Sequence, residues 1–197
     1  MLAFAVCSRP ECTRRAVTGF DFCLEHLPDP VSATTTLVAG LRGEAEHRSL
    51  CLDRLEMSDI DLSGHRFRDC VFSHAIFSNV DFSGAKLYLC FFDFAAFIDC
   101  KFLGSSMKSV VFSCATISGT SFAGSDMLHS NFNGIQAREV DFSDSDLYFS
   151  TFVGASLNSV AFVDCNLKKV RFGYSDRIGV NFRYSNYQEA DFTEERI

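Results

Sequence analysis

Four residues near the N-terminus could together bind a metal ion. They are Cys7, Cys12, Cys23 and His26, and they lie close together in the chain. Three cysteine thiolates and one histidine imidazole complete the tetrahedral shell that structural zinc prefers. Because a segment this short buries little apolar surface, bound metal could supply the free energy that folds it. The pattern therefore predicts one structural Zn²⁺ ion with no open coordination position for catalysis.

Two other interpretations of these residues remain open. The cysteines could be free thiols packed against the rest of the chain, or they could have a redox role. The ligand spacing is not one of the standard zinc-finger patterns. Arg14 and Arg15 add positive charge, but without a wider basic surface they do not make a nucleic-acid-binding finger.

In the rest of the chain, which must position this cluster, an apolar residue recurs every five positions. The apolar series begins at Leu62, Phe67 and Phe72 and continues to Ile197; it fails only at Ala137 and Arg177. Five matches neither the helical period of 3.6 nor the strand period of 2. A fixed repeat of this kind indicates a solenoid, in which each unit buries its apolar face against the next.

The repeat unit resembles that of the pentapeptide repeat family, which reads roughly Ala-Asp/Asn-Leu/Phe-X-X. The segments "VDFSG" at 80–84 and "VDFSD" at 140–144 match this unit residue by residue. The resemblance implies an all-β fold, a right-handed quadrilateral β-helix with four pentapeptides in each coil. The predicted organisation is a Cys/His zinc-binding module at 1–30, a helical or irregular linker or cap at 31–57, and a β-helix of about seven coils at 58–197.

A second period of twenty residues supports the four-sided coil. One set of positions runs from Leu62 through Phe82 to Phe182, and another, ten residues away, runs from Phe72 to Phe192; both consist almost entirely of phenylalanine. The pattern predicts two phenylalanine ladders on opposite sides of the solenoid. At the irregular position Arg177 we expect the side to bulge, with Ile178 or its neighbours filling in, because burying an unpaired guanidinium is costly.

Composition limits the function classes. The formal net charge of −7 argues against non-specific nucleic-acid binding, which needs a basic surface. No apolar run approaches the length needed to span a membrane, and the apolar N-terminus lacks the charged leader of a secretory signal. We therefore expect a cytoplasmic protein. Most cysteines of the repeat occupy small inward positions, where cysteine acts as a small hydrophobic residue.

The repeat region offers surfaces for binding and little for catalysis. It contains no nucleophile elbow and no phosphate loop, so we expect no enzymatic activity. An outward apolar strip is predicted around one corner, and such strips often mark interfaces. Its residues are Tyr88, Leu89, Phe91, Phe94, Tyr148 and Phe149, with Val71 beside them. Docking of the chain's own residues 31–57 on this strip is the alternative.

Two functions follow as expectations. The first is a scaffold or adaptor that binds a protein partner along its flank, without direct contact to nucleic acid or membrane. The second is implied by resemblance to family members that mimic DNA and protect DNA gyrase, a type II topoisomerase, from inhibitors. It would use an acidic patch formed by Asp126, Glu139, Asp141, Asp144 and Asp146. It would also require a homodimer through the C-terminal coil, at Phe192 and Ile197.

Overall fold

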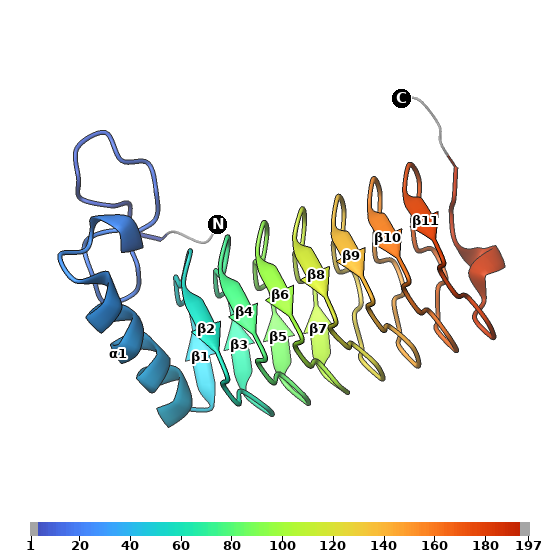
Figure 1. Cartoon of the computed structure of the whole chain (residues 1–197), viewed down its shortest axis with the longest axis horizontal. Helices are drawn as coiled ribbons and strands as arrows, with labels where there is room; N and C mark the ends of the chain where they lie inside the picture. Colours follow the sequence, from blue (N-terminus) through green and yellow to red (C-terminus); the bar gives the residue numbers. More distant parts are fainter. Residues whose placement is uncertain (1–3, 194–197) are drawn as a thin grey trace.

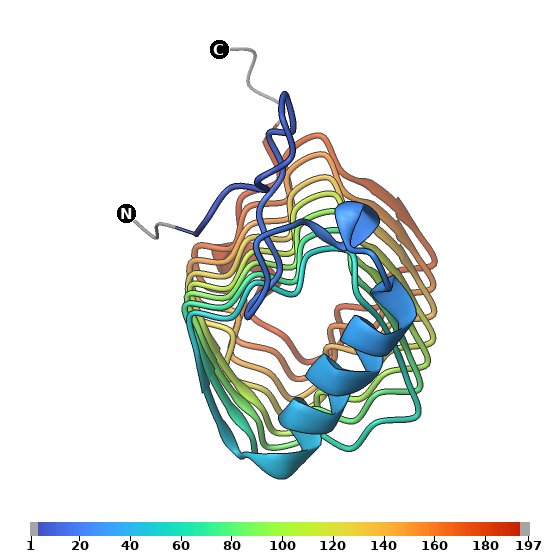
Figure 2. The same cartoon turned by 90° about the vertical axis from the view of Figure 1, so that its left-hand side faces the viewer.

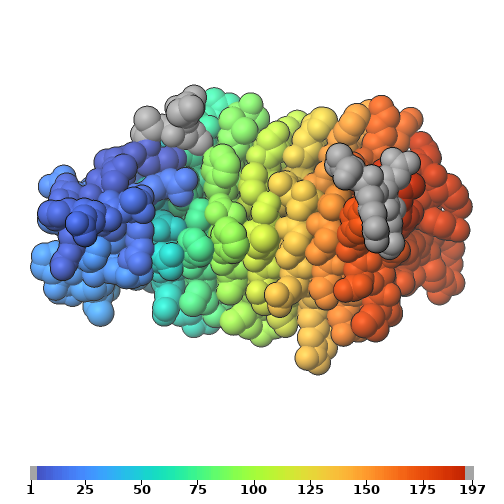
Figure 3. All heavy atoms as spheres, turned by 90° about the horizontal axis from the view of Figure 1, so that it is seen from above, coloured from blue at the N-terminus to red at the C-terminus, as the bar shows by residue number. Residues whose placement is uncertain are grey.

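Short strands stack in parallel along one axis and form a solenoid. The computed structural model describes residues 4–193, so Ile197 lies outside the described residues. About seven four-sided coils succeed one another in chain order along a rod (Figures 1 and 2). In the space-filling view, the N-terminal residues cover one end of this rod (Figure 3).

Two parallel sheets form two sides of the rod. The four-stranded sheet contains β1 (Glu46–Arg48), β3 (Arg66–Arg68), β5 (Lys86–Tyr88) and β7 (Ser106–Lys108). The seven-stranded sheet contains β2 (Glu56–Ser58), β4 (Ile76–Ser78), β6 (Ala96–Ile98), β8 (Thr116–Ser118), β9 (Gln136–Arg138), β10 (Ser156–Asn158) and β11 (Asp176–Ile178). Two short 3₁₀ helices, η1 (Leu24–His26) and η2 (Tyr187–Glu189), and one α-helix, α1 (Pro30–Gly43), complete the fold.

The register confirms the predicted twenty-residue coil. Met57 pairs with Phe77, and Phe77 pairs with Phe97, so each inward residue lies over its equivalent one coil away. In nearly every strand the central residue is buried while its neighbours are more exposed. The five-residue period therefore corresponds to one inward side chain on each side of the four-sided coil.

The two phenylalanine ladders are present and meet in the centre of the rod. Within one ladder, Phe122 stacks on Phe102 and Phe142 with ring centroids 4.8 and 4.9 Å apart. Between the ladders, Phe122 meets Phe132 edge to face at 6.1 Å and 83°. Parallel-displaced stacks and perpendicular pairs are both favourable arrangements of the aromatic quadrupole. The rings fill the interior completely, with no exposure at these positions.

The solenoid begins earlier than residue 58, which corrects the predicted boundary. Strand β1 pairs with β3, and β2 pairs with β4, so residues 46–57 belong to the first coil. His47, Leu52 and Met57 hold its inward positions and are 5%, 1% and 2% exposed. Because His47 is polar, it interrupts the five-residue apolar pattern in this segment, and the sequence did not reveal the first coil. Only the helical part of the predicted linker lies outside the coils.

Helix α1 lies across the open end of this first coil (Figure 2). Pro30 occupies its first turn, and the Asp29 carboxylate caps it by accepting a hydrogen bond from the Ser32 amide at 3.0 Å. Leu41 is buried in the core, and Leu37 and Val38 pack against it. Within residues 4–193, the structure contains no helix long and apolar enough to cross a membrane.

The expected bulge at Arg177 is wrong. Strand β11 keeps its register, with Arg177 directly beside Leu157. Its guanidinium is exposed, donates hydrogen bonds to the Ser175 hydroxyl and the Phe172 carbonyl, and lies 5.0 Å from the ring centre of Phe192. Ile178 does not fill in, since it is 66% exposed. Arg177 is tolerated because it lies at the end of the core, where its charge keeps contact with water.

The ladders should supply most of the stability of the rod. We expect Phe122→Ala or Phe132→Ala to lower the free energy of unfolding by about 3–5 kcal/mol, because each leaves a cavity in a fully packed interior. Denaturant unfolding followed by circular dichroism measures this loss. Ser118→Ala, on the outward surface, is the control and should change stability by less than about 0.5 kcal/mol. Similar small effects for all three variants would contradict the ladder model.

Candidate metal centre

The four predicted ligands come together in the N-terminal module. The ligand atoms of Cys7, Cys12, Cys23 and His26 all lie within 4.8 Å of one another. Nδ1 of His26 is 3.4 Å from the sulfur of Cys7 and 3.4 Å from that of Cys23, and the sulfurs of Cys12 and Cys23 are 4.0 Å apart. Around a tetrahedral zinc ion, bond lengths of about 2.3 Å for sulfur and 2.0 Å for nitrogen place ligand atoms roughly 3.5–3.8 Å apart. The donor set and its spacing therefore fit zinc.

Two short backbone features hold the ligands in place. Val6 and Arg15 form an antiparallel bridge, and the Cys7 amide donates to the Arg14 carbonyl at 2.9 Å, so a tight hairpin carries Cys7 and Cys12. The other two ligands lie at the ends of η1: Cys23 precedes it directly and His26 is its last residue, and the His26 amide donates to the Cys23 carbonyl at 2.9 Å. This turn brings the ring of His26 back to the sulfur of Cys23.

The electrostatics of the site favour one preformed thiolate. Burial opposes ionisation of Cys7, but hydrogen bonds with the backbone of Cys23 and Arg9 and with the side chains of His26 and Cys12 together lower the pKa of the Cys7 thiol to about 6. Burial and the neighbouring Cys7 raise the pKa of Cys23. Since zinc binds thiolates, the hydrogen bonds that stabilise the Cys7 thiolate also favour metal binding at this site. A bound ion would supply the positive charge that lets the remaining thiols ionise.

The module is joined to the first coil of the solenoid. Val17 is 1% exposed and belongs to the same core as Leu41. The Cys51 amide donates to the Thr18 hydroxyl at 2.6 Å, and the Thr18 amide donates to the Cys51 carbonyl at 3.0 Å. Ordering the metal ligands therefore also orders the segment that covers the end of the rod.

The predicted apolar strip is divided by the structure. Tyr88, Phe94 and Phe149 are 42%, 56% and 41% exposed. Phe94 stacks on His74, whereas Phe149 stacks on His129, so these two rings stand at neighbouring corners and not at one. The remaining strip residues are partly buried (Leu89, Phe91, Tyr148) or buried (Val71).

Residues 31–57 do not cover this strip. Residues 30–43 form α1 across the end of the rod, and the first coil begins at Glu46. Docking of the chain's own segment on the strip, the alternative considered above, is therefore wrong. Tyr88 and Phe149 remain on the flank of the rod.

The predicted acidic patch extends over two sides of the rod. Asp126 and Asp146 stack on the side of β7, while Asp141 stacks on Ser121 on the next side. Two of the carboxylates also stabilise the backbone: Asp141 accepts from the Ser143 amide at 2.9 Å, and Asp146 accepts from the Tyr148 amide at 3.0 Å. Glu139 pairs with Arg138 at 3.2 Å, and Asp144 occupies a corner. The five carboxylates do not form one flat surface.

A contact between two histidines was not predicted. Nε2 of His47 lies 3.3 Å from Nδ1 of His65, and the ring of His47 stacks on Phe67 at 4.6 Å. Burial, and then the neighbouring His65, lower the pKa of His47. The twenty-residue register could have revealed His47, because it occupies the position below Phe67.

Comparison with known proteins agrees with this architecture. The family described as pentapeptide repeats matches residues 56–93 and 90–128, with eight copies of the unit. This chain is a pentapeptide repeat protein. No curated protein sequence matches it significantly.

Solved pentapeptide repeat structures are similar to this chain at low sequence identity. One is a trypsin-treated variant of QnrB1, a plasmid-mediated fluoroquinolone resistance protein, with 21% identity and a TM-score of 0.46; the match covers 75% of this chain and 79% of that chain. Another is HetL, a pentapeptide repeat protein involved in heterocyst differentiation regulation from the cyanobacterium Nostoc sp. strain PCC 7120. It has 14% identity and a TM-score of 0.33, and the match covers 84% of this chain and 97% of that chain.

The pentapeptide repeat protein should bind one zinc ion per chain through its N-terminal module. Elemental analysis of protein purified without chelator measures the metal content. Replacing Cys23 with serine should abolish binding, while Cys114→Ser, at an exposed corner cysteine outside the cluster, should leave it unchanged. Metal far below one equivalent in the unmodified protein would contradict this prediction.

Acidification should release the metal. Zinc requires deprotonated thiolates, so protons compete with it and the affinity falls as the pH falls. Titration with a chromophoric zinc indicator between pH 8 and about pH 5 follows the release. Zinc binding that does not change over this range would exclude the thiolate ligands.

Proposed function

We propose that this protein is a non-enzymatic scaffold that binds a protein partner along one flank of its rod. The observation that carries the proposal is the presence of large aromatic residues at exposed corners. Phe94 and Phe149 both have left-handed backbone conformations, with φ of 58° and 61°. Glycine occupies equivalent conformations at several other corners, such as Gly84 and Gly124.

A bulky side chain in this conformation carries a backbone cost. Burial of the ring offsets little of it, because half of the Phe94 side chain and much of the Phe149 side chain remain in contact with water. The fold itself is better served by glycine, asparagine or aspartate at such corners. Other bulky residues, such as Leu89 and Tyr174, adopt the same conformation at other corners, so it is the exposure of the two rings that supports a contact outside the chain.

Neighbouring side chains hold the exposed rings in place. His129 stacks on Phe149 at 5.2 Å, Tyr148 meets its edge at 4.8 Å, and the Lys169 ammonium lies 4.6 Å from its ring centre. Rings fixed in this way lose little conformational entropy on binding. Aromatic residues surrounded by partly buried neighbours are typical of the centre of a protein interface. The partner surface is therefore expected to be apolar where it meets Phe149, with acidic groups near Lys169.

The second candidate function is DNA mimicry towards a type II topoisomerase. Its support is the stack of Asp126 and Asp146 close to Asp144, together with the end of the phenylalanine ladders. Phe182 and Phe192 are only partly buried there, so a second rod could stack on them. This function requires a dimer in scattering experiments and protection of gyrase supercoiling. It also requires loss of that protection in Asp144→Lys.

Replacing Phe149 with asparagine should separate binding from folding. Asparagine tolerates the left-handed conformation, so the free energy of unfolding should stay within about 0.5 kcal/mol of the original. Partner recovery should fall by about thirtyfold if the ring is a central contact. The intact protein serves as bait in quantitative affinity capture, and Phe94→Asn is tested beside it.

The matched control is Ser159→Asn. Ser159 is also an exposed corner residue, with φ of 55°, but it follows β10 on another side of the rod. If Phe149→Asn and the unmodified protein recover the same amount of partner, the flank is not the binding surface. A monomer in solution that has no effect on gyrase would reject DNA mimicry and leave the scaffold proposal intact.

A further inference from the structure

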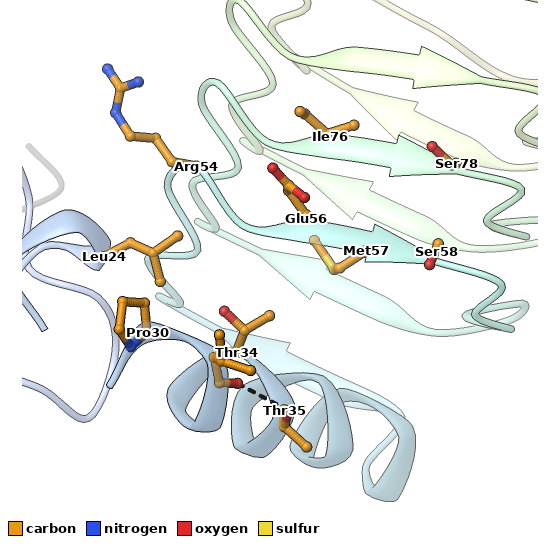
Figure 4. A pocket seen from close by; sticks show the side chains of 11 residues that line it. Leu24, Pro30, Thr34, Thr35, Arg54, Glu56, Met57, Ser58, Ile76 and Ser78 are labelled. Carbon is orange, nitrogen blue, oxygen red and sulfur yellow. Dashed lines mark hydrogen bonds between the residues drawn. The ribbon is translucent and has the colours of Figure 1, made fainter. Parts of the chain in front are cut away.

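A groove separates α1 from the first strand of the seven-stranded sheet. Its wall on the helix side includes Thr34 and Thr35, and its wall on the sheet side includes Glu56 and Ser58 (Figure 4). Val38 also lines the helix side. Two overlapping hollows of about 680 and 570 Å³ make up the groove. Each is within the size range of pockets that bind ligands. None of the groove residues belongs to the aromatic strip on the flank.

The sheet wall of the groove is an unpaired strand edge. In the later coils, the amide at this position donates to a carbonyl of the coil before it: Ile76 to Leu55 at 2.9 Å, and Ala96 to Ala75 at 2.9 Å. The same bond recurs as far as Asp176, which donates to Ala155 at 2.8 Å. At Glu56 the series would require residue 35 as acceptor, but Thr35 lies in α1. Among residues 4–193, β2 pairs with β4 alone and is the terminal strand of its sheet, so the edge that carries the amides of Glu56 and Ser58 has no strand beside it.

The other sides of the first coil show what is special about this edge. On one side the Cys51 amide, at the equivalent position, donates to the Thr18 hydroxyl. In the described part of the chain, β1 pairs with β3 alone and Asp61 bridges only to Asp81, so the edges at Glu46 and Asp61 on the remaining sides also have no strand beside them. Glu46 also lines a hollow, but that hollow lies over β1, β3 and β5. What distinguishes Glu56 is that its hollow lies between the strand and α1 (Figure 4).

We propose that this groove binds an extended peptide that pairs in parallel with β2 and adds a strand to the seven-stranded sheet. A free edge offers alternating N–H and C=O groups, and an extended backbone is the ligand that satisfies them together. The coils already specify the register. Asp59 donates to the Ser78 carbonyl at 3.0 Å one coil later, so a peptide amide would donate to Ser58 in the same way.

The lining of the groove specifies the side chains of the peptide. Met57 is 2% exposed beneath α1, so the peptide residue that points inward beside it must be glycine or alanine. The outward neighbour of that residue lies next to Glu56, which forms no ion pair in the described residues. Opposite charges at neighbouring strand positions attract, so lysine or arginine fits there. The expected ligand is a short extended peptide that contains, in chain order, a basic residue, a small residue and a polar residue.

The probe is a pool of capped pentapeptides, acetyl-Ala-Lys-Ala-X-Asn-amide, with mixed residues at X. We expect the pool to slow hydrogen exchange at the amides of Glu56 and Ser58 by about tenfold at saturation, because pairing protects them. The control pool carries an N-methyl group on the central alanine, which removes the N–H that would donate to the Glu56 carbonyl. Its apparent affinity should be about tenfold weaker.

Two protein variants test the position of the site. Thr35→Trp fills the groove from the helix side and should abolish protection by the peptide. Thr36→Trp is the matched control: both threonines are exposed and both hydroxyls donate at 2.9 Å to the carbonyl four residues earlier, but Thr36 does not line the groove.

The flank variant Phe149→Asn should bind the pool normally, so failure of this site and failure of the proposed scaffold function are distinguishable. Equal binding of the N-methylated pool would overturn the proposal. No protection at Glu56 and Ser58 at millimolar peptide, or unchanged binding by Thr35→Trp, would overturn it as well.

Discussion

Stacking between equivalent residues of successive coils is the interaction on which this structure depends. The ring of Phe112 lies 5.2 Å from that of Phe92 and 4.9 Å from that of Phe132, and the backbone repeats the same contacts through hydrogen bonds between coils. No coil buries its own apolar face, so each is stable only between two others. This constraint explains why the interior is filled by rings and why the inward positions tolerate so little variation.

Because of the same constraint, the apolar core would be exposed to water at the two ends of the rod unless other residues covered it. At the N-terminal end, α1 and the Cys/His module cover the core with Leu41 and Val17. At the other end, Arg177 lies over the ring of Phe192 and Tyr187 of η2 contacts the ring of Phe182, while Arg177 remains exposed to water. The metal ligands are therefore best understood as part of the cap. A short irregular segment can hold its shape over an exposed core if four of its side chains bind one ion.

The two proposed binding surfaces lie on the outside of the solenoid, because phenylalanine rings such as Phe112 and Phe122 fill its interior. The flank and the groove beside β2 offer different recognition chemistry. On the flank, fixed aromatic rings present apolar area to a partner surface. In the groove, unpaired backbone groups select for an extended chain, and Glu56 and Met57 limit its side chains. A scaffold with both surfaces could bind two partners at once, one by side-chain contacts and one by strand addition.

The sequence by itself determined the repeating part of this protein. Phe122 and its neighbours in the ladder are spaced by a constant twenty residues, so the coil, the ladders and the corners can be read from the chain. The Cys7 to His26 cluster could also be predicted, since ligands so close in sequence are brought together by short turns. Tertiary structure alone decided what happens where the repeat stops. The contact of His47 with His65, the exposed position of Arg177, the division of the strip between two corners and the groove beside β2 all depend on how α1 and the last coil end the stack. The period places His47 and Arg177 in register with the neighbouring coil. Beyond each end there is no further coil, so the period carries no information about what covers these residues.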